Sequence, residues 1–290
     1  MSALAPSEIL RVGNTLGEGI LWDSRREVLW WTDIQGRCLH RYEWASGALQ
    51  ILAAPERIGS FGLIAGSEEL ITAFASGIAV YDARQQTLAW LARPEAPAGV
   101  RFNDGRVDRR GRFWAGTMME GETHSPVGCL YSIDSTGEAR CQLRGVSISN
   151  GLCVSPDGRR LYFADSPTRT ISVYELDEPE GVLGTRRTFA QTPEGALPDG
   201  ATVDVDGCVW SAHWGAGQVV RYTPDGRIDR TIQVPTLHCT CVCFAGPQLE
   251  VLCVTSAREG LEAQALDAHA GDVFLYRTGT QGLPESEYRP

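Results

Sequence analysis

Four residues with oxygen-bearing side chains stand directly before a glycine at intervals along the chain. They are Glu18, Asp104, Asn150 and Asp199. Carboxylate and amide oxygens are the ligands that hard divalent cations prefer in proteins. Asp-Gly and Asn-Gly are also ordinary turn dipeptides, so any one of these residues alone would be weak evidence for a metal site. Their recurrence in one context, together with Glu18, which is not a turn former, favours a metal site.

A repeat along the chain would position these residues. Apolar segments rich in Trp, Tyr or Phe recur 41 to 48 residues apart, beginning near Leu29, Leu70, Phe113, Leu161, Val209 and Val251. This period suits a four-stranded propeller blade, and no long stretch has a helical apolar stripe. The sequence therefore predicts an all-β fold, a six-bladed β-propeller with a central metal site, as a single domain over residues 1–290. We expect Glu8–Val12 to add a terminal strand to the sixth blade.

The propeller would bring the four side chains together at its axis. The first strand of each blade lines the central channel, so equivalent positions converge there. Aligned on the recurring glycine, the first five blades carry Glu18, Phe61, Asp104, Asn150 and Asp199. Carboxylates this close repel one another, and burying them unpaired is costly. One divalent cation removes both problems. Ca²⁺ is our first choice for oxygen ligands, with Zn²⁺, Mn²⁺, Mg²⁺ and Fe²⁺ as alternatives.

Other polar residues are expected at the same end of the channel. Arg101 offers five donors and Asn103 both donates and accepts, which suits a ligand rich in hydroxyl and carbonyl groups, although Arg101 could instead pair with a surface acid. Because neighbouring strands run antiparallel, loops between second and third strands should overhang the site: Met118–Val127, Asp165–Arg169, His213–Gly217 and Ser256–Ala270. The candidates in them are Glu120, Glu122 and His124 as a lid, and His213 and Trp214 as a pocket wall.

Composition narrows the function classes. The net charge of −10 argues against nucleic acid or an anionic membrane surface as a partner, because both need a basic footprint. Met1–Pro6 has no secretory-signal pattern, and no apolar run could span a bilayer. Cys239, Cys241 and Cys243 alternate along one strand, and small buried thiols explain them better than a metal site does. We therefore expect a cytoplasmic protein.

Several short motifs, in this order, resemble the gluconolactonase/regucalcin (senescence marker protein) family. The resemblance runs from about Thr15 to Tyr276 and rests on Leu16-Gly17-Glu18-Gly19, Arg101-Phe102-Asn103-Asp104-Gly105, Gly111-Arg112-Phe113-Trp114-Ala115-Gly116-Thr117-Met118, Ser149-Asn150-Gly151 with Ser155-Pro156-Asp157-Gly158, and Pro198-Asp199-Gly200. It implies a six-bladed propeller that is a metal-dependent hydrolase of sugar lactones.

The resemblance also implies roles for individual residues. Glu18, Asn150 and Asp199 would bind the metal, and Asp199 would also be the catalytic acid/base. The substrate would be held by Arg101, Asn103 and a lid carboxylate, for which Glu120 is our first choice and Glu122 the alternative. Asp104 would support the ligands rather than bind the metal.

The expected function is hydrolysis of a small-molecule aldonolactone, such as glucono-, xylono-, arabinono- or galactonolactone, to the free sugar acid. The chain has no G-x-S-x-G motif, which argues against a serine acyl-enzyme. Two alternatives stay open, since fold does not set function. One is a hydrolase of aryl esters, aldarolactones or phosphotriesters, and the other is a calcium-binding propeller without catalysis.

Overall fold

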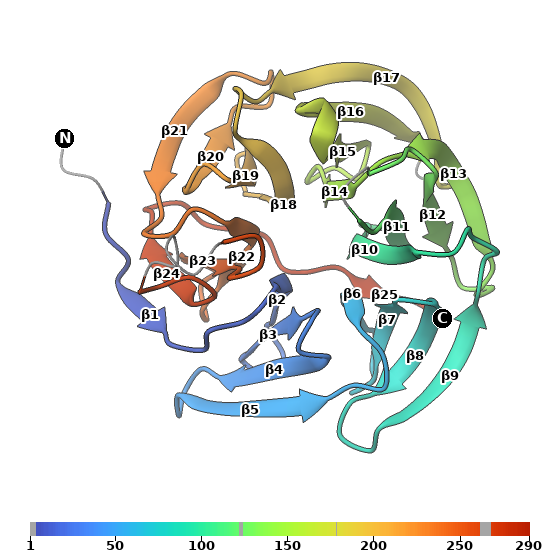
Figure 1. The fold of residues 1–290 in the computed structure, drawn as a ribbon, viewed down its shortest axis with the longest axis horizontal. Coiled ribbons are helices and arrows are strands. Elements are labelled where there is room, and N and C mark those ends of the chain that lie inside the picture. The colour runs from blue at the N-terminus through green and yellow to red at the C-terminus, as the bar shows by residue number, and fades with distance from the viewer. Residues whose placement is uncertain (1–3, 122–123, 178, 262–267) are drawn as a thin grey trace.

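The computed structural model describes residues 4–121, 124–177, 179–261 and 268–290. In these residues the strands form six sheets placed radially around one axis, as the six-bladed propeller prediction requires (Figure 1). The innermost strands are β2 (Gly17–Asp23), β6 (Ile58–Ile64), β10 (Val100–Val107), β14 (Ser149–Val154), β18 (Leu197–Val203) and β22 (Cys239–Ala245). Within the described residues no helix is long and apolar enough to cross a membrane. That the ring is a single domain stays a prediction.

Each blade continues outward through antiparallel neighbours. The second strands are β3 (Val28–Asp33), β7 (Leu70–Phe74), β11 (Phe113–Met119), β15 (Arg160–Asp165), β19 (Val209–Trp214) and β23 (Val251–Ser256). The third strands are β4 (Cys38–Glu43), β8 (Gly77–Asp82), β12 (Gly128–Ile133), β16 (Thr170–Asp177), β20 (Gln218–Tyr222) and β24 (Val273–Arg277). The outer strands are β5 (Ala48–Ala53), β9 (Thr87–Ala92), β13 (Ala139–Val146), β17 (Val182–Gln191), β21 (Ile228–Gln233) and β1 (Glu8–Leu10).

Two segments distant in sequence tie the ring together. Strand β1 pairs antiparallel with β24, so the predicted terminal strand of the sixth blade is confirmed over Glu8–Leu10. After β24 the chain crosses the ring to β25 (Glu287–Tyr288), which pairs parallel with β6 (Figure 1). In this crossing segment Glu285 accepts a hydrogen bond from the Arg106 guanidinium at 2.8 Å. Arg106 lies on β10 and also donates to the backbone oxygen of Ala201 on β18.

Burial falls from the axis to the rim. Almost every residue of the six innermost strands is buried, whereas β5 and β21 are mostly exposed. Polar and apolar residues of the inner strands are buried alike, because neighbouring blades cover both of their faces. Cys239, Cys241 and Cys243 lie on the innermost strand β22, and all three are buried, as predicted.

An aspartate organises the turn between the first two strands in blades 3 and 5. Both turns have the pattern Asp-x-x-Gly-x-x-Trp, from Asp108 to Trp114 and from Asp204 to Trp210. Each aspartate accepts a hydrogen bond from the indole nitrogen of its tryptophan, at 2.9 and 2.8 Å. Asp204 also accepts from backbone amides of its turn and from the Arg221 guanidinium at 2.8 Å. A buried carboxylate is tolerated here because donors surround it.

We predict that Asp204→Asn lowers the free energy of unfolding by about 1.5–3 kcal/mol, because Trp210 and Arg221 lose a buried charged acceptor. Asp206→Asn is the matched control. Asp206 pairs with the same arginine, but its side chain is 66% exposed, so its loss should cost less than about 1 kcal/mol. Urea denaturation measures both, and equal midpoints for the two variants would contradict this account.

Candidate metal centre and substrate cavity

Each of the four predicted residues lies at a break in strand register, which changes the direction of its side chain. The pairing of each relevant inner strand shifts at this point, between Glu18 and Leu21, Phe102 and Gly105, Asn150 and Cys153, and Pro198 and Ala201. Such bulges redirect side chains out of the regular alternation and are common beside active sites. Two of the glycines that follow, Gly19 and Gly151, have φ of 59° and 66°, which disfavours other residues there.

Three carboxyl groups meet at the axis. Glu18, Asp104 and Asp199 are 8%, 7% and 6% exposed, so water screens them little. Both Asp104 oxygens accept backbone hydrogen bonds at 2.8 Å, one from Gly105 and one from Leu152 on the next blade. Glu18 accepts one backbone hydrogen bond, from Gly19 at 3.1 Å, and Asp199 lies near it. Two neighbouring buried carboxyl groups repel each other when both are ionised, so the pair favours a protonated form.

Burial and like charge make these groups hard to ionise. Burial, reinforced by Asp104, raises the pKa of Glu18 from its usual 4.5 to about 8. Burial and the charges of Glu18 and Asp104 raise the pKa of Asp199 well above its ordinary value. The pKa of Asp104 rises less, to about 6, because backbone donors and Arg106 oppose the effect of burial. A cation beside Glu18 and Asp199 would reverse these shifts.

Asn150 completes the set of oxygens, and its amide is oriented on both sides. Its nitrogen donates to the Ser166 hydroxyl at 2.9 Å, and its oxygen accepts from the Asn103 amide at 2.9 Å. The Ser166 hydroxyl in turn donates to the carbonyl of Pro198, next to Asp199, at 2.7 Å. Ser166 begins the short 3₁₀ helix Ser166–Thr168. Two carboxylates and one oriented amide oxygen form a donor set that fits a hard divalent cation.

Arg101 and Asn103 lie beside this centre. The Arg101 guanidinium donates through Nη1 to the Asn103 oxygen at 2.7 Å and through Nε to Glu120 at 3.1 Å. Burial lowers the pKa of Arg101, and the Glu120 carboxylate opposes that change. Glu120 also accepts from Arg57 at 2.8 Å. Glu120 therefore holds Arg101 in position from behind. Glu122 lies outside the described residues.

A cavity of about 200 Å³ opens onto the centre. It brings together residues from five of the six blades: Leu16, Glu18, Arg101, Asn103, Met118, His124, Ile148, Asn150, Ser166, Leu197, Asp199, Trp214 and Glu259. The predicted metal ligands and both predicted substrate residues of β10 are among them. Asp104 and Glu120 are not among these lining residues.

The pocket wall differs in part from the sequence-based interpretation. Trp214 lines the cavity as expected, but His213 does not. The His213 side chain is turned into its blade, where its ring nitrogens lie 3.2 Å from Gln218 and 3.3 Å from the Tyr222 hydroxyl. Burial lowers the pKa of His213 to about 4, so it is neutral at pH 7. Successive residues of a strand point to opposite faces, so only one of this pair can face the cavity.

Sequence reasoning did not single out Ser166 and Glu259. Both lie in loops that were expected to overhang the site, Asp165–Arg169 and Ser256–Ala270. Position in those loops was the only available signal, because a lone serine or glutamate in a polar loop has no distinctive spacing. The contacts that matter, such as Ser166 with Pro198, join different blades.

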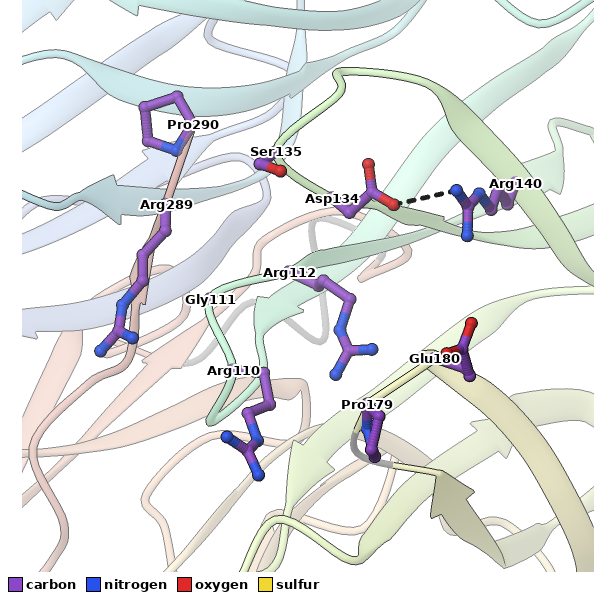
Figure 2. A pocket seen from close by; sticks show the side chains of 10 residues that line it. All are labelled: Arg110, Gly111, Arg112, Asp134, Ser135, Arg140, Pro179, Glu180, Arg289 and Pro290. Atoms are coloured by element: carbon purple, nitrogen blue, oxygen red, sulfur yellow. Dashed lines mark ion pairs between the residues drawn. The ribbon is translucent and has the colours of Figure 1, made fainter.

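A larger cavity, of about 580 Å³, is lined by ten residues (Figure 2). Most of them belong to turns that join first to second strands and third to fourth strands, which lie at the opposite end of the propeller, and Arg289 and Pro290 follow β25. In it Arg140 pairs with Asp134 at 3.2 Å, and Arg112 pairs with the buried Asp108 at 3.0 Å. These arginines are paired with aspartates of the protein, and the larger cavity lies away from Glu18, Asp104 and Asp199. We therefore place the candidate reaction site in the smaller cavity.

Comparisons with known proteins agree with this geometry. The SMP-30/Gluconolactonase/LRE-like region model matches residues 16–258. The 6-deoxy-6-sulfogluconolactonase of Pseudomonas putida is 40% identical over 285 residues, which cover 96% of each chain. The L-arabinolactonase of Azospirillum brasilense is 38% identical over 282 residues, covering 95% of this chain and 92% of the relative.

Among solved structures, the calcium-binding protein regucalcin from Agrobacterium tumefaciens aligns with a TM-score of 0.93 at 31% identity, covering 100% of both chains. The match therefore extends over every blade as well as the local motifs. The chain belongs to the SMP-30/gluconolactonase/LRE-like family.

Proposed function

We propose that this protein is a metal-dependent lactonase that hydrolyses an aldonolactone to the free sugar acid. The observation that carries the proposal is the buried pair Glu18 and Asp199, which lines a small cavity together with the oriented oxygen of Asn150. The cavity, at about 200 Å³, is below the about 300–1,000 Å³ of drug-sized pockets, which suits one sugar ring. Two relatives are named for sugar lactones.

Glu18, Asn150 and Asp199 would hold one divalent cation, which when bound supplies Lewis-acid polarisation of a carbonyl oxygen. Asp199 accepts a proton from the attacking water while the water oxygen forms a bond to the lactone carbonyl carbon. The carbon–ring oxygen bond then breaks, and Asp199 returns the proton to the departing oxygen. Water is thereby added across the ester, which gives a hydroxyl and a carboxylic acid in one open-chain molecule. At neutral pH the acid then releases its proton to solvent and leaves as the carboxylate.

Arg101 is the substrate donor in this proposal, and Asn103 positions it. In the described residues, Asn103 uses its amide hydrogens on the Ser149 carbonyl and on Asn150. The hydrogen bonds that Arg101 makes to the described residues use Nε and Nη1, so Nη2 offers its two hydrogens to a lactone oxygen. Glu120 acts through Arg101 in this arrangement and takes no direct part in substrate binding.

Calcium binding without catalysis is the second candidate, favoured by the description of the Agrobacterium structure as a calcium-binding protein. Ca²⁺ is our first choice of cation for either function. Acid release from a panel of aldonolactones, with aldarolactones and aryl esters alongside, separates the two. A cytoplasmic location and the lack of nucleic-acid or membrane partners stay predictions from composition.

Removal of the cation should abolish lactone hydrolysis, because the pKa of Asp199 is raised without it and a protonated Asp199 cannot act as a base. Exhaustive dialysis against chelator, verified by elemental analysis, should reduce acid release to the spontaneous rate, and Ca²⁺, Mn²⁺ or Zn²⁺ should restore it. Full activity of verified metal-free protein would sink the proposal.

The stability of the metal-free protein should fall as pH rises. The folded-state pKa values of Glu18 and Asp104, about 8 and about 6, lie above those of the unfolded chain. The stabilising effect is therefore complete below the ordinary pKa values, 4.5 for Glu18 and 3.8 for Asp104, and is lost as pH rises through about 6 for Asp104 and about 8 for Glu18. Urea midpoints at pH 5.5, 7 and 8.5 should fall without cation and change much less with Ca²⁺. Glu18→Gln should flatten the metal-free curve, and a midpoint that rises with pH would contradict us.

Asp199→Asn separates the two roles of Asp199. The amide keeps a ligating oxygen but cannot accept the proton, so kcat should fall by about 10²–10⁴ even at saturating cation. Asn150→Asp is the comparison, because it adds charge at a neighbouring ligand and should tighten cation binding without supplying a base at position 199. Cation titration followed by kinetics at saturation measures both. Near wild-type kcat for saturated Asp199→Asn would remove the acid/base role from Asp199.

A further inference from the structure

Blades 5 and 6 supply an aromatic wall to the cavity. The Trp214 indole stacks on the His238 imidazole, with ring centroids 3.9 Å apart and planes 16° apart. The backbones of these two residues form an antiparallel bridge. The Nδ1 atom of His238 lies 2.8 Å from the Glu259 carbonyl oxygen. The imidazole is thus held by a hydrogen bond and supports the indole, which lines the cavity.

Glu259 is fixed in the same wall by its backbone. Its amide donates to the Thr15 carbonyl at 2.9 Å, and the Arg258 amide donates to the same oxygen at 3.0 Å. The Ala257 amide donates to the His238 carbonyl at 3.0 Å. The turn that carries Glu259 is therefore tied both to the strand that leads to Glu18 and to the support of Trp214.

The Glu259 side chain has an unmet acceptor. It lines the cavity, and its Oε2 atom is buried without a hydrogen-bond donor in the described part of the chain. The charges of Arg101 and Arg57 attract Glu259 without a hydrogen bond to either being formed among the described residues. A buried carboxylate oxygen without a donor is unfavourable, so a ligand that brings a donor to this place gains binding free energy.

A flat apolar ring and a fixed acceptor side by side define the chemistry of the ligand. The C–H face of a sugar ring can pack on the indole while one hydroxyl donates to the carboxylate. Across the cavity, Arg101 supplies donors for the lactone oxygens. A carboxylate or phosphate substituent next to Glu259 would meet like charge instead, which is unfavourable.

We propose that Trp214 and Glu259 form a hydroxyl-recognition subsite that selects a neutral polyhydroxylated lactone ring, with Glu259 as the specificity-determining residue and His238 as the positioning residue for both. This inference rests on the proposed lactonase function and narrows its substrate class. It favours aldonolactones over aldarolactones, which carry a second carboxylate. A site built around a hydroxyl discriminates strongly against a substrate that lacks it.

The test compares Glu259→Met, which has similar length but no acceptor, with Glu259→Gln, which keeps an acceptor oxygen. The kcat/KM is measured for the best aldonolactone of the panel and for its monodeoxy analogues. For the wild type, one analogue should lose about 10- to 100-fold. On the parent lactone, Glu259→Met should lower kcat/KM by a similar factor. On that analogue, the kcat/KM of Glu259→Met should equal that of the wild type. Glu259→Gln should recover part of the loss on the parent lactone.

The control and the cation affinity exclude a structural explanation. Glu68→Gln changes a carboxylate of the same type that is 65% exposed and lies at the far end of blade 2, so it should match the wild type on every lactone. Cation affinity should be unchanged in all variants. A Glu259→Met variant that loses the same factor on every analogue, or none on any, would overturn the subsite.

Binding of a non-hydrolysable cyclic polyol, methyl β-D-xyloside, separates failure of this inference from failure of the proposed function. Quenching of tryptophan fluorescence in Ca²⁺-loaded protein should be seen for the wild type and lost in Trp214→Ala and Glu259→Met. This result without any lactone hydrolysis would support the subsite and refute the lactonase. Lactone hydrolysis that is indifferent to Glu259 and Trp214 would support the lactonase and refute the subsite. Neither binding nor hydrolysis would refute both.

Discussion

Repulsion between buried carboxylates at the propeller axis is the constraint on which the rest of this structure depends. Burial raises the pKa values of Glu18, Asp104 and Asp199, and like charge raises those of Glu18 and Asp199 further, so the three groups do not ionise together readily. The chain tolerates them in two different ways. Backbone amides and the charge of Arg106 partly offset the burial of Asp104, whereas Glu18 and Asp199 are left close together with strongly raised pKa values. The first is a structural solution, and the second leaves a pair of acceptors ready for a cation.

The blades supply the rigidity that this crowding needs. Inner strands buried on both faces cannot move apart without exposing apolar surface, and the bulges at the ligand positions are held inside that packing. At Gly200, a Cβ atom would lie 2.5 Å from the Cys241 sulfur, so β18 and β22 approach each other there as only glycine allows. Arg106 draws β10, β18 and the crossing segment before β25 together below the carboxylates.

One wall of the cavity consists of polar side chains linked by successive hydrogen bonds. The other wall contains the stacked rings of Trp214 and His238. Arg57 and Glu120 hold Arg101, Arg101 holds Asn103, and Asn103 holds the oxygen of Asn150. Each side chain in the series has its orientation set by the one behind it. Precise placement of this kind is what positioning a substrate against a reactive centre requires.

The sequence by itself determined the six-bladed propeller, the closing strand near Glu8, and the convergence of Glu18, Asp104, Asn150 and Asp199. These follow from the repeat length and from the recurring glycine after each of the four residues, which are local signals. The burial of the three cysteines of β22 was also predictable, because both faces of an innermost strand are covered by neighbouring blades.

Only the tertiary structure decided what the loops contribute. Glu120 turned out to face Arg57, 63 residues away, and Glu259 is held by Thr15 from the other end of the chain. His213 turned into its blade and left Trp214 to the cavity. Loop residues lack periodicity, and their orientation depends on partners supplied by other blades. The spacing of loop residues along the chain therefore does not predict which residue of another blade they contact.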